Sequence, residues 1–371
     1  MIQLTKISIE GYKSIQVCSQ LRLGKLNVLI GANGAGKSNF ISFFKLVNLA
    51  MTGALQLFIS RSGGARSLLH FGPKKTPQCS ATLEFETDRG HNTYHARLFH
   101  AAGDTLIFGE ESVSFWGHGW NTPPRPIVLG AGHRESALLA PQHAEDKTVR
   151  FIKTTLPRFR AYQFHDTSDE SHLRSNVRID DNRFLYADGG NLAAFLRVIR
   201  ETYPERYGRI IETIRLVVPF FQDFVLDPPR DSENHVRLNW RRKGSDYEFG
   251  PHQLSDGTLR FMALATLLLQ PTDWLPAMII IDEPELGLHP YAIQVLTALM
   301  GETSQHAQIV AATQSAVLVD EVDPSDVVLV DMRDEASTFT RVDGEKLKDW
   351  LRDYTLGQLW LKNALDGGVP G

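Results

Sequence analysis

The amino-acid sequence predicts an α/β fold built on a mostly parallel central sheet, and three observations support this class. A short apolar run at 26–30 passes directly into a glycine-rich loop, and apolar residues at helical spacing follow the loop. Strand and helix patterns alternate again between 278 and 330, in the last third of the chain. Between these regions, 80–116 carries short apolar runs separated by turn residues, which favours an antiparallel β-meander.

The predicted strands lie where apolar residues alternate or form short runs between turn residues. Residues 1–10 alternate, whereas 26–30 has the continuous apolar character of a strand that is covered on both faces. In the meander we expect four strands, the last two separated by a turn at Gly109-Glu110-Glu111. In chain order, the strands after 30 are predicted at 81–85, 93–99, 105–108, 112–116, 278–281, 308–312 and 327–330, with a hairpin over 234–249 that turns at Lys243-Gly244-Ser245-Asp246.

Apolar residues three or four positions apart predict the helices. The first helix follows the glycine loop, and its apolar face carries Phe40, Phe43, Phe44 and Val47. Further helices are predicted at 191–200, 206–217, after Leu254 and after Pro290. We therefore expect one two-lobed body, in which lobe I is formed by 1–135 and 275–371 and lobe II, a helical insertion, by about 136–274.

Composition and charge exclude several classes of protein. With 42% hydrophobic and 22% charged residues, the chain is globular and not disordered. Its formal net charge of -4 attracts neither nucleic acid nor a membrane by itself, and no apolar run approaches the roughly 20 residues of a membrane helix. Cys18 and Cys79 make neither a disulfide framework nor a zinc cluster, and they fit a reducing compartment. The first residues show no apolar signal core, so we expect a cytoplasmic protein without a membrane partner.

The glycine-rich loop has the spacing of a phosphate-binding loop. Its residues fit G-x-x-x-x-G-K-[ST] at every fixed position, and they are Gly31, Ala32, Asn33, Gly34, Ala35, Gly36, Lys37 and Ser38. Glycines let main-chain N–H groups curl around phosphate oxygens, and the helix that follows presents its N-terminus to the anion. Lys37 is then expected to reach the β- and γ-phosphates of ATP, and the Ser38 hydroxyl to ligate Mg²⁺.

Two acids follow the apolar strand at 278–281. Asp282 and Glu283 come where a buried parallel strand delivers side chains to its carboxyl edge. We expect Asp282 to hold Mg²⁺ through its hydration shell, and Glu283 to orient or deprotonate the attacking water. Beside a complete phosphate-binding loop, this pair predicts an ATPase.

Several further segments resemble one bacterial family along nearly the whole chain. Leu254-Ser255-Asp256-Gly257-Thr258 resembles the signature motif of ABC-type ATPases, and it stands just before the second acidic strand, in the order of that family. The run 282–290, DEPELGLHP, is similar to the form found in RecF-like and OLD-like ATPases. The other similar segments are YQFHDTS (162–168), DGGNLAAFL (188–196), TQS (313–315) and the closing LGQLW (356–360) with GGVP (367–370). The chain thus resembles the RecF/OLD/SMC-like AAA-type ATPases.

The resemblance implies a P-loop NTPase of the ABC-ATPase head type that works as a head-to-tail homodimer. Two ATP molecules would lie at the interface, each on one subunit's phosphate-binding loop and capped by Ser255 and Gly257 of the other subunit. Lys13 and Ser14, in the GYKSI segment, match the basic position that helps to hold nucleotide in relatives. Asn39, directly after the loop, is counted with the nucleotide-binding residues.

The chain departs from the family in three places. The switch position, usually His, is Gln314, whose amide can donate to the γ-phosphate but carries no charge, so slow turnover is expected. Thr258 stands where transporter signatures carry Gln or Glu, and His289 stands where transporter subunits place the D-loop aspartate. The third departure is the Q-loop glutamine, which the pattern does not assign; Gln78 is a guess.

No heptad run lies between Ser38 and Leu254, and the segment after Ser315 is too short for a TOPRIM nuclease domain. We therefore expect a bare head without coiled-coil arms or TOPRIM domain, and any effector on a separate chain.

Acids and histidines cluster at 165–172 and 180–181, but without metal-ligand spacing, so a solvated loop is favoured there. Three basic segments are candidate DNA contacts, although a solvated face is favoured for each: 150–160, 240–243 and 74–75.

Two functions stay open. The first is an ATPase that acts on DNA, in repair or in defence against phage. The second is a regulatory scaffold whose ATP cycle controls a separate effector, a nuclease or a toxin. An ABC transporter subunit is less favoured, because of the EPELGLHP run, Thr258, Gln314 and the missing Q-loop.

Overall fold

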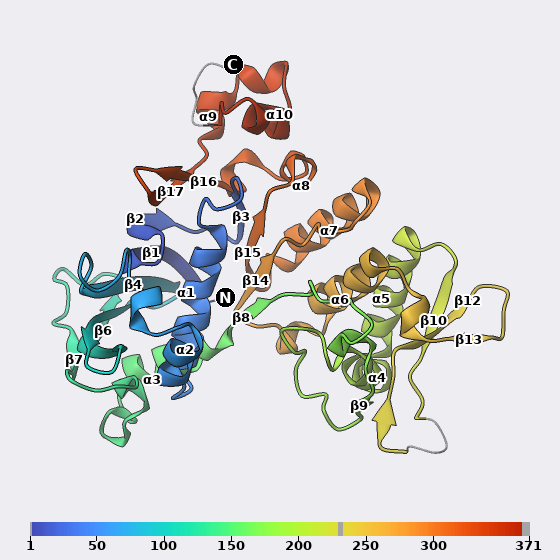
Figure 1. The fold of residues 1–371 in the computed structure, drawn as a ribbon, viewed down its shortest axis with the longest axis horizontal. Coiled ribbons are helices and arrows are strands. Elements are labelled where there is room, and N and C mark those ends of the chain that lie inside the picture. The colour runs from blue at the N-terminus through green and yellow to red at the C-terminus, as the bar shows by residue number, and fades with distance from the viewer. Residues whose placement is uncertain (1, 229–232, 366–371) are drawn as a thin grey trace.

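Two six-stranded sheets and the helices around them form the molecule (Figure 1). The computed structural model describes residues 2–228 and 233–365, so the GGVP segment at 367–370 lies outside the described residues. Helix α1 (Lys37–Ala50) lies between the sheets and shares one hydrophobic core with both. A second core fills the space between the other face of the parallel sheet and the helices α4 to α7.

The parallel sheet carries the predicted central strands. Its order is β17-β16-β3-β15-β14-β8, and all neighbours are parallel except β17, which is antiparallel to β16. Every residue of β3, β14 and β15 is buried, because helices or the second sheet cover both faces. The strands are β3 (Leu26–Ile30), β8 (Phe159–Tyr162), β14 (Met278–Asp282), β15 (Gln308–Thr313), β16 (Val327–Arg333) and β17 (Ala336–Arg341).

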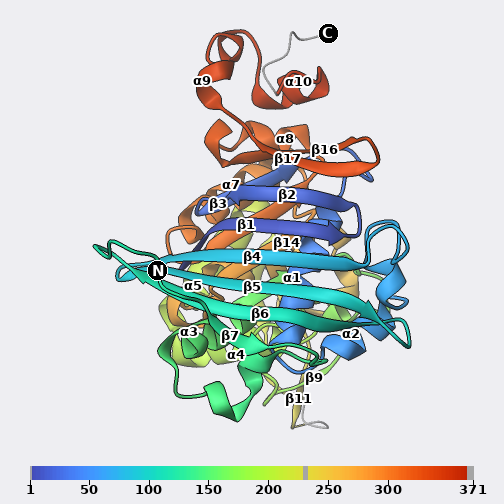
Figure 2. The same ribbon diagram turned by 90° about the vertical axis from the view of Figure 1, so that its left-hand side faces the viewer.

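The antiparallel sheet, seen face-on in Figure 2, contains the predicted meander in the order β2-β1-β4-β5-β6-β7. Its strands are β1 (Gln3–Tyr12), β2 (Ile15–Arg22), β4 (Gln78–Thr87), β5 (Gly90–Ala101), β6 (Thr105–Gly117) and β7 (Ile127–Gly130). The turn predicted at 109–111 is wrong, because β6 runs through it as one strand with a bulge at Gly109. A Cβ at Gly109 would lie 2.1 Å from the Phe99 ring, so the glycine reflects close packing and not a chain reversal.

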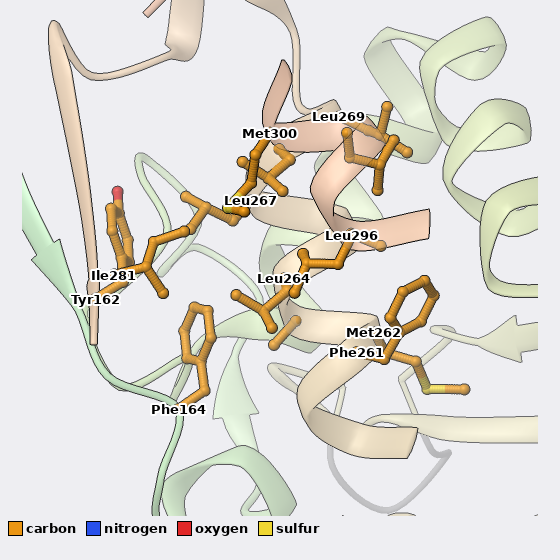
Figure 3. Packing of buried hydrophobic residues seen from close by; sticks show 14 of the residues in the cluster. Tyr162, Phe164, Phe261, Met262, Leu264, Leu267, Leu269, Ile281, Leu296 and Met300 are labelled. Carbon is orange, nitrogen blue, oxygen red and sulfur yellow. The ribbon is translucent and has the colours of Figure 1, made fainter. Parts of the chain in front are cut away.

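Helices and two small sheets form the other side of the molecule. The helices are α4 (Leu192–Thr202), α5 (Pro204–Val217), α6 (Asp256–Leu269) and α7 (Pro290–Thr303). Figure 3 shows their core, in which Phe261 and Leu264 of α6 and Leu296 of α7 are buried together with Phe164 and Ile281. The predicted hairpin is present, because β12 (Asn239–Arg242) pairs with β13 (Glu248–Phe249). On its other side β12 pairs with β10 (Phe221–Val225). A separate two-stranded sheet is formed by β9 (Val177–Arg178) and β11 (His235–Val236).

The remaining helices border the two sheets. They are α2 (Leu55–Arg61), α3 (Lys147–Thr155), α8 (Ala316–Asp320), α9 (Gly344–Leu347) and α10 (Leu356–Leu361). The α3 helix and β8 fall within the range 136–274 that we assigned to lobe II, yet Val149 and Ile152 of α3 are buried in the core around α1, and β8 pairs with β14. We therefore propose that the lobe boundary falls after Tyr162. No helix in the described residues is long and apolar enough to span a membrane.

Candidate nucleotide-binding site

The phosphate-binding loop joins the buried end of β3 to the start of α1. Ala32, Asn33 and Gly34 are exposed, while Gly34 and Gly36 have φ of 81° and 111°, a region that favours glycine. A Cβ at Gly36 would lie 2.0 Å from the Ser337 hydroxyl oxygen, so a side chain does not fit there. Within the described residues no side chain caps α1, and its first turn has no acid. The uncapped N–H groups are therefore available to an anion.

Lys37 folds back over its own loop. Its Nζ donates to the main-chain oxygens of Gly31 at 2.7 Å and of Ala32 at 3.1 Å. Burial lowers the pKa of Lys37, and the nearby carboxylates of Glu283, Asp282 and Glu285 oppose that shift. The ammonium group is therefore held at the loop, close to the acids that the sequence analysis pairs with it.

The turn between β1 and β2 contacts the loop from the antiparallel sheet. Ser14 Oγ accepts a hydrogen bond of 2.7 Å from Asn39 Nδ2 and one of 2.7 Å from Ser337 Oγ. Lys13, whose φ is 48°, donates through Nζ to Ser42 Oγ of α1 at 2.8 Å. Both predicted residues of the GYKSI segment therefore lie beside α1, with Ser14 nearer to the glycines than the Lys13 ammonium.

Asp282 ends β14, and its side chain meets a glutamine that the sequence analysis did not assign. Gln163 Nε2 donates to Asp282 Oδ2 at 3.3 Å, and Lys45 Nζ donates to Gln163 Oε1 at 2.8 Å. Gln163 directly follows β8, the neighbour of β14 in the parallel sheet, so both side chains emerge at the same carboxyl edge. Gln78, our earlier guess, lies on β4 opposite Phe99 of β5. The sequence feature that indicates Gln163 is a polar residue directly after a short strand, within the YQFHDTS segment.

The segment after Asp282 brings two more carboxylates to the switch residue. Glu283 has φ of 45°, its N–H donates to Ala312 O at 2.8 Å, and its Oε1 accepts from Gln314 Nε2 at 3.4 Å. Glu285 accepts from the Thr313 hydroxyl and from the Gln314 N–H. The predicted base and the predicted switch residue are thus within hydrogen-bonding distance of each other.

Burial raises the pKa of Glu285, and the hydrogen bond from the Thr313 hydroxyl acts against that rise. The second carboxylate oxygen of Glu285 is buried and has no hydrogen-bond partner in the described residues. This third acid was not among the predicted site residues.

The signature segment forms the start of α6. Ser255 is the N-cap, and its Oγ accepts from the Thr258 N–H at 3.3 Å. A Cβ at Gly257 would lie 2.2 Å from the main-chain oxygen of Gly287, so this glycine packs directly on the loop that follows Asp282 and Glu283. Among the described residues, no hydrogen bond joins Ser255 or Gly257 to residues 31–38.

Two arginines hold the signature segment against the rest of the site. Arg260 of α6 donates to the main-chain oxygens of Phe164 at 2.9 Å, His165 at 2.6 Å and Leu286 at 3.0 Å. Arg174 is buried and pairs with Asp256 at 2.9 Å. The start of α6 is therefore fixed both to the segment after β8 and to the segment after β14.

The acidic and histidine-rich loop is divided among several contacts. His165 contacts Asp282 O at 2.9 Å, His172 pairs with Asp188 at 2.7 Å, and Asp169 pairs with His252 at 3.3 Å. Throughout the described part of the chain, no group of three His, Cys, Asp or Glu residues is placed to hold a metal ion. Of the basic segments, 150–160 is divided between α3 and β8, and 240–243 lies at the hairpin of β12.

Comparison with known proteins gives a family match over most of the chain. A sequence model described as "AAA domain, putative AbiEii toxin, Type IV TA system" matches residues 26–320, which contain both the phosphate-binding loop and the acids. No curated protein matches the chain significantly.

Solved structures with this fold include an SMC head bound to the C-winged helix domain of ScpA, at 17% identity and a TM-score of 0.62, covering 93% of this chain and 99% of that chain. An SMC head with an extended coiled coil, bound to the C-terminal domain of ScpA and derived from Pyrococcus furiosus, has 16% identity and a TM-score of 0.58. The match covers 95% of this chain and 99% of that chain. The SMC head domain from Thermotoga maritima has 17% identity and a TM-score of 0.51, covering 92% and 99%.

Proposed function

This chain belongs to the AAA-domain family whose model it matches, and we propose that it binds and slowly hydrolyses Mg-ATP between two copies of itself. Its fold is that of a P-loop NTPase of the ABC-ATPase head type, as the resemblance predicted. As an AAA-family ATPase related to SMC heads, it has a nucleotide-binding fold; the residue roles, the dimer and the client are the proposal.

The residues present fit a magnesium nucleotide. Gly34 and Gly36 have φ values that favour glycine, the N-terminus of α1 is uncapped among the described residues, and Lys37 donates to the main chain of the loop. Ser38 and Asp282 offer the hydroxyl and carboxylate oxygens that Mg²⁺ prefers, and the ion would neutralise charge on the phosphates.

Glu283 would accept a proton from the attacking water or orient it, with Gln314 holding the carboxylate in place. Because Gln314 is neutral, it stabilises developing negative charge less than a histidinium ion would, which is why we expect slow turnover.

Exposed apolar side chains around this site support a dimer. Leu286, Tyr291, Val317 and Leu361 are 38%, 48%, 41% and 68% exposed, and they lie on the loop after β14, on α7, on α8 and on α10. Ser255 is also exposed, as a residue that caps the nucleotide of a second copy must be. Apolar side chains grouped around a polar site favour an interface between protein surfaces.

The observation that carries the proposal is the hydrogen bond between Gln314 and Glu283, beside Asp282 and the phosphate-binding loop. Its test uses Glu283→Gln, measured by ATP hydrolysis and by light scattering after size-exclusion chromatography. We expect the variant to bind Mg-ATP, to lose at least about 100-fold in hydrolysis, and to accumulate as a dimer. Hydrolysis at the wild-type rate would contradict the assignment of Glu283.

For the client of the ATPase we propose DNA first, on the basis of the basic segments and of the resemblance to RecF-like ATPases. A mobility-shift assay at low salt should detect binding that depends on Mg-ATP; its absence with active enzyme would exclude this role.

The second proposal, a regulator of a separate effector, is favoured by the toxin–antitoxin description of the family and by solved heads that bind a ScpA domain. Co-purification from the native host, with and without nucleotide, tests it; recovery of only the homodimer in both conditions would count against it. A transporter subunit is still the least favoured function, because of the EPELGLHP run, Thr258 and Gln314. The missing Q-loop glutamine is no longer a reason against it, because Gln163 contacts Asp282 as a Q-loop glutamine would.

A further inference from the structure

A pocket of about 660 Å³ lies next to the nucleotide site. It is bounded by α1, by the free edge of β8 and by the segment 184–187. It is lined chiefly by aromatic rings, among them Phe44, Phe184 and Tyr186, and by the cations Lys45 and Arg160. None of the described residues that line it is acidic. The pocket therefore suits a ligand that combines a flat ring with negative charge.

One of the two cations lies against an exposed ring, and a second exposed ring lies beside it. The Arg160 guanidinium lies 4.0 Å from the centroid of the Phe184 ring, and the Phe184 and Tyr186 rings are 5.7 Å apart. Phe184 and Tyr186 are 41% and 36% exposed. Nucleobases stack on exposed aromatic rings and on guanidinium planes, and phosphates pair with arginine.

The surface continues beyond the pocket. A smaller depression of about 350 Å³ shares Arg160 and Phe184 with it and adds Arg158, Arg183 and Trp274; its acid among the described residues is Asp273. Together the two depressions offer more basic and aromatic lining than one mononucleotide contacts, which favours a strand with several phosphates.

An added peptide strand fits this place less well. The outer edge of β8 is already bonded at both ends, because Asn48 Nδ2 donates to Phe159 O at 2.9 Å and the Gln163 N–H donates to Ala187 O at 2.8 Å. Only the main chain near Ala161 is left open between these bonds, which is too short for the ladder that β-augmentation needs.

We propose that this pocket holds an unpaired nucleotide of a single nucleic-acid strand, with the base against Phe184 and Tyr186 and the neighbouring phosphates on Arg158, Arg160 and Arg183. This inference rests on the DNA-directed form of the proposed function and names the strand and the surface. It also explains how the basic segment 150–160 contributes, since Arg158 and Arg160 are its members at the pocket.

Occupancy of the pocket can reach the metal-binding acid through two side chains. Lys45 lines the pocket and donates to Gln163 at 2.8 Å, and Gln163 donates to Asp282 at 3.3 Å. A phosphate in the pocket competes with Gln163 for the Lys45 ammonium. Release of Gln163 then changes how the amide contacts Asp282, so strand binding alters hydrolysis.

The binding test uses a fluorescein-labelled oligothymidylate of about 15 nucleotides, with fluorescence anisotropy on the full chain at low salt, with and without Mg-ATP. We expect Arg160→Ala and Phe184→Leu each to weaken binding about tenfold, because the first variant loses a phosphate contact and the second a stacked base.

The matched controls are Arg89→Ala and Trp120→Leu. Both side chains are exposed, neither lines a depression, and neither belongs to one of the three basic segments. Both controls should bind within about twofold of wild type.

The outcomes separate the two proposals. Wild type that hydrolyses ATP but does not bind the strand contradicts the DNA role and this inference with it. Wild type that binds the strand while both variant pairs behave alike overturns only the pocket. If thymidine monophosphate competes with an affinity equal to that of oligothymidylate, the ligand is not a strand, and the pocket is assigned to a free nucleotide. Strand binding that depends on Arg160 and Phe184 without hydrolysis upholds the pocket and removes the ATPase proposal.

The connection to Asp282 has its own test. Saturating oligothymidylate should change the wild-type rate of ATP hydrolysis at least about twofold, whereas in Lys45→Met the rates with and without the strand should agree. A wild-type rate that the strand leaves unchanged, or a Lys45→Met ratio equal to that of wild type, would show that the relay is wrong.

Discussion

Glu285 adds a carboxylate to the interior of the loop that carries Asp282 and Glu283. One of its oxygens accepts from Thr313 and from Gln314, while the other is buried without a partner among the described residues. Because desolvation penalises the ionised form, burial raises the pKa of this group. Ionisation of this carboxyl group therefore weakens the folded state, although the same group accepts a hydrogen bond from the main chain of Gln314, the predicted switch residue.

Glu285→Gln tests this cost through its pH dependence. A raised folded-state pKa contributes stability that is complete below the unfolded pKa, about 4.5 for glutamate, and is lost as pH rises through the folded pKa. We therefore expect the variant to unfold at a higher temperature than wild type at pH 7, and the difference to vanish near pH 4. Differential scanning calorimetry across this range checks it, with the exposed Glu170→Gln as control; an equal gain from both variants would contradict the argument.

Gly257 is the residue through which the signature segment packs on the loop after β14. A Cβ there would approach the Gly287 carbonyl oxygen to 2.2 Å, whereas a Cβ at Gly208, on α5, would meet nothing within 4 Å. We expect Gly257→Ala to cost about 1–3 kcal/mol of stability and to reduce hydrolysis, and Gly208→Ala to be neutral or stabilising by up to about 1 kcal/mol. Urea unfolding and a steady-state ATPase assay compare the two; equal stability changes would show that the close contact is not sensitive to volume.

Among the elements, β6 contains a bulge, and an acidic residue just after the bulge is buried. The bulge at Gly109 shifts the register between Phe108 and Glu110, and Glu111 beyond it is fully buried. Its carboxylate accepts from the Tyr94 hydroxyl at 2.8 Å, the Ala137 N–H at 2.7 Å and the Ser136 hydroxyl, and pairs with His133 at 2.8 Å. One carboxylate thus fastens the segment after β7 to the antiparallel sheet.

Removing that carboxylate should weaken the whole sheet. We expect Glu111→Ala to cost about 3 kcal/mol, because several buried donors lose their acceptor together. The neighbouring Glu110→Ala is the control: its side chain is 48% exposed and 3.8 Å from Arg97, and surface pairs of this kind contribute at most about 1 kcal/mol. Guanidinium unfolding, followed by tryptophan fluorescence, measures both; similar losses would show that Glu111 is not the fastening group.

Elements of the parallel sheet differ in how far the sequence predicts them. Continuous apolar runs predicted β3, β14 and β15, because burial on both faces leaves a local pattern. β8 was missed, since Arg160 interrupts its four residues and its role depends on pairing with β14, far along the chain. Gln163 was missed for the same reason: a glutamine becomes a site residue only once β8 stands beside β14. Likewise, no local pattern shows that Arg260 reaches the segments after both strands.

At the scale of the molecule, the parallel sheet joins both cores. Alternate residues of β14 enter different cores, with Ile279 and Ile281 among the helices and Met278 and Ile280 toward α1 and the antiparallel sheet. A strand that changes position in one core must therefore disturb the other. The two lobes that we propose are for this reason not independent units, even though this division places the predicted signature segment and the phosphate-binding loop in different lobes.

This shared sheet, together with the position of the phosphate-binding loop at the end of β3, predicts the response of the whole molecule to nucleotide. We expect one unfolding transition in calorimetry, and Mg-ATP at about 100 times its Kd should stabilise the protein by about 2.7 kcal/mol. Because Lys37 is the cation at the loop, Lys37→Ala should unfold in one transition that Mg-ATP does not move. If wild type shows two transitions and nucleotide shifts only one of them, the lobes unfold separately, and the cores on the two faces of β14 do not act as one cooperative unit.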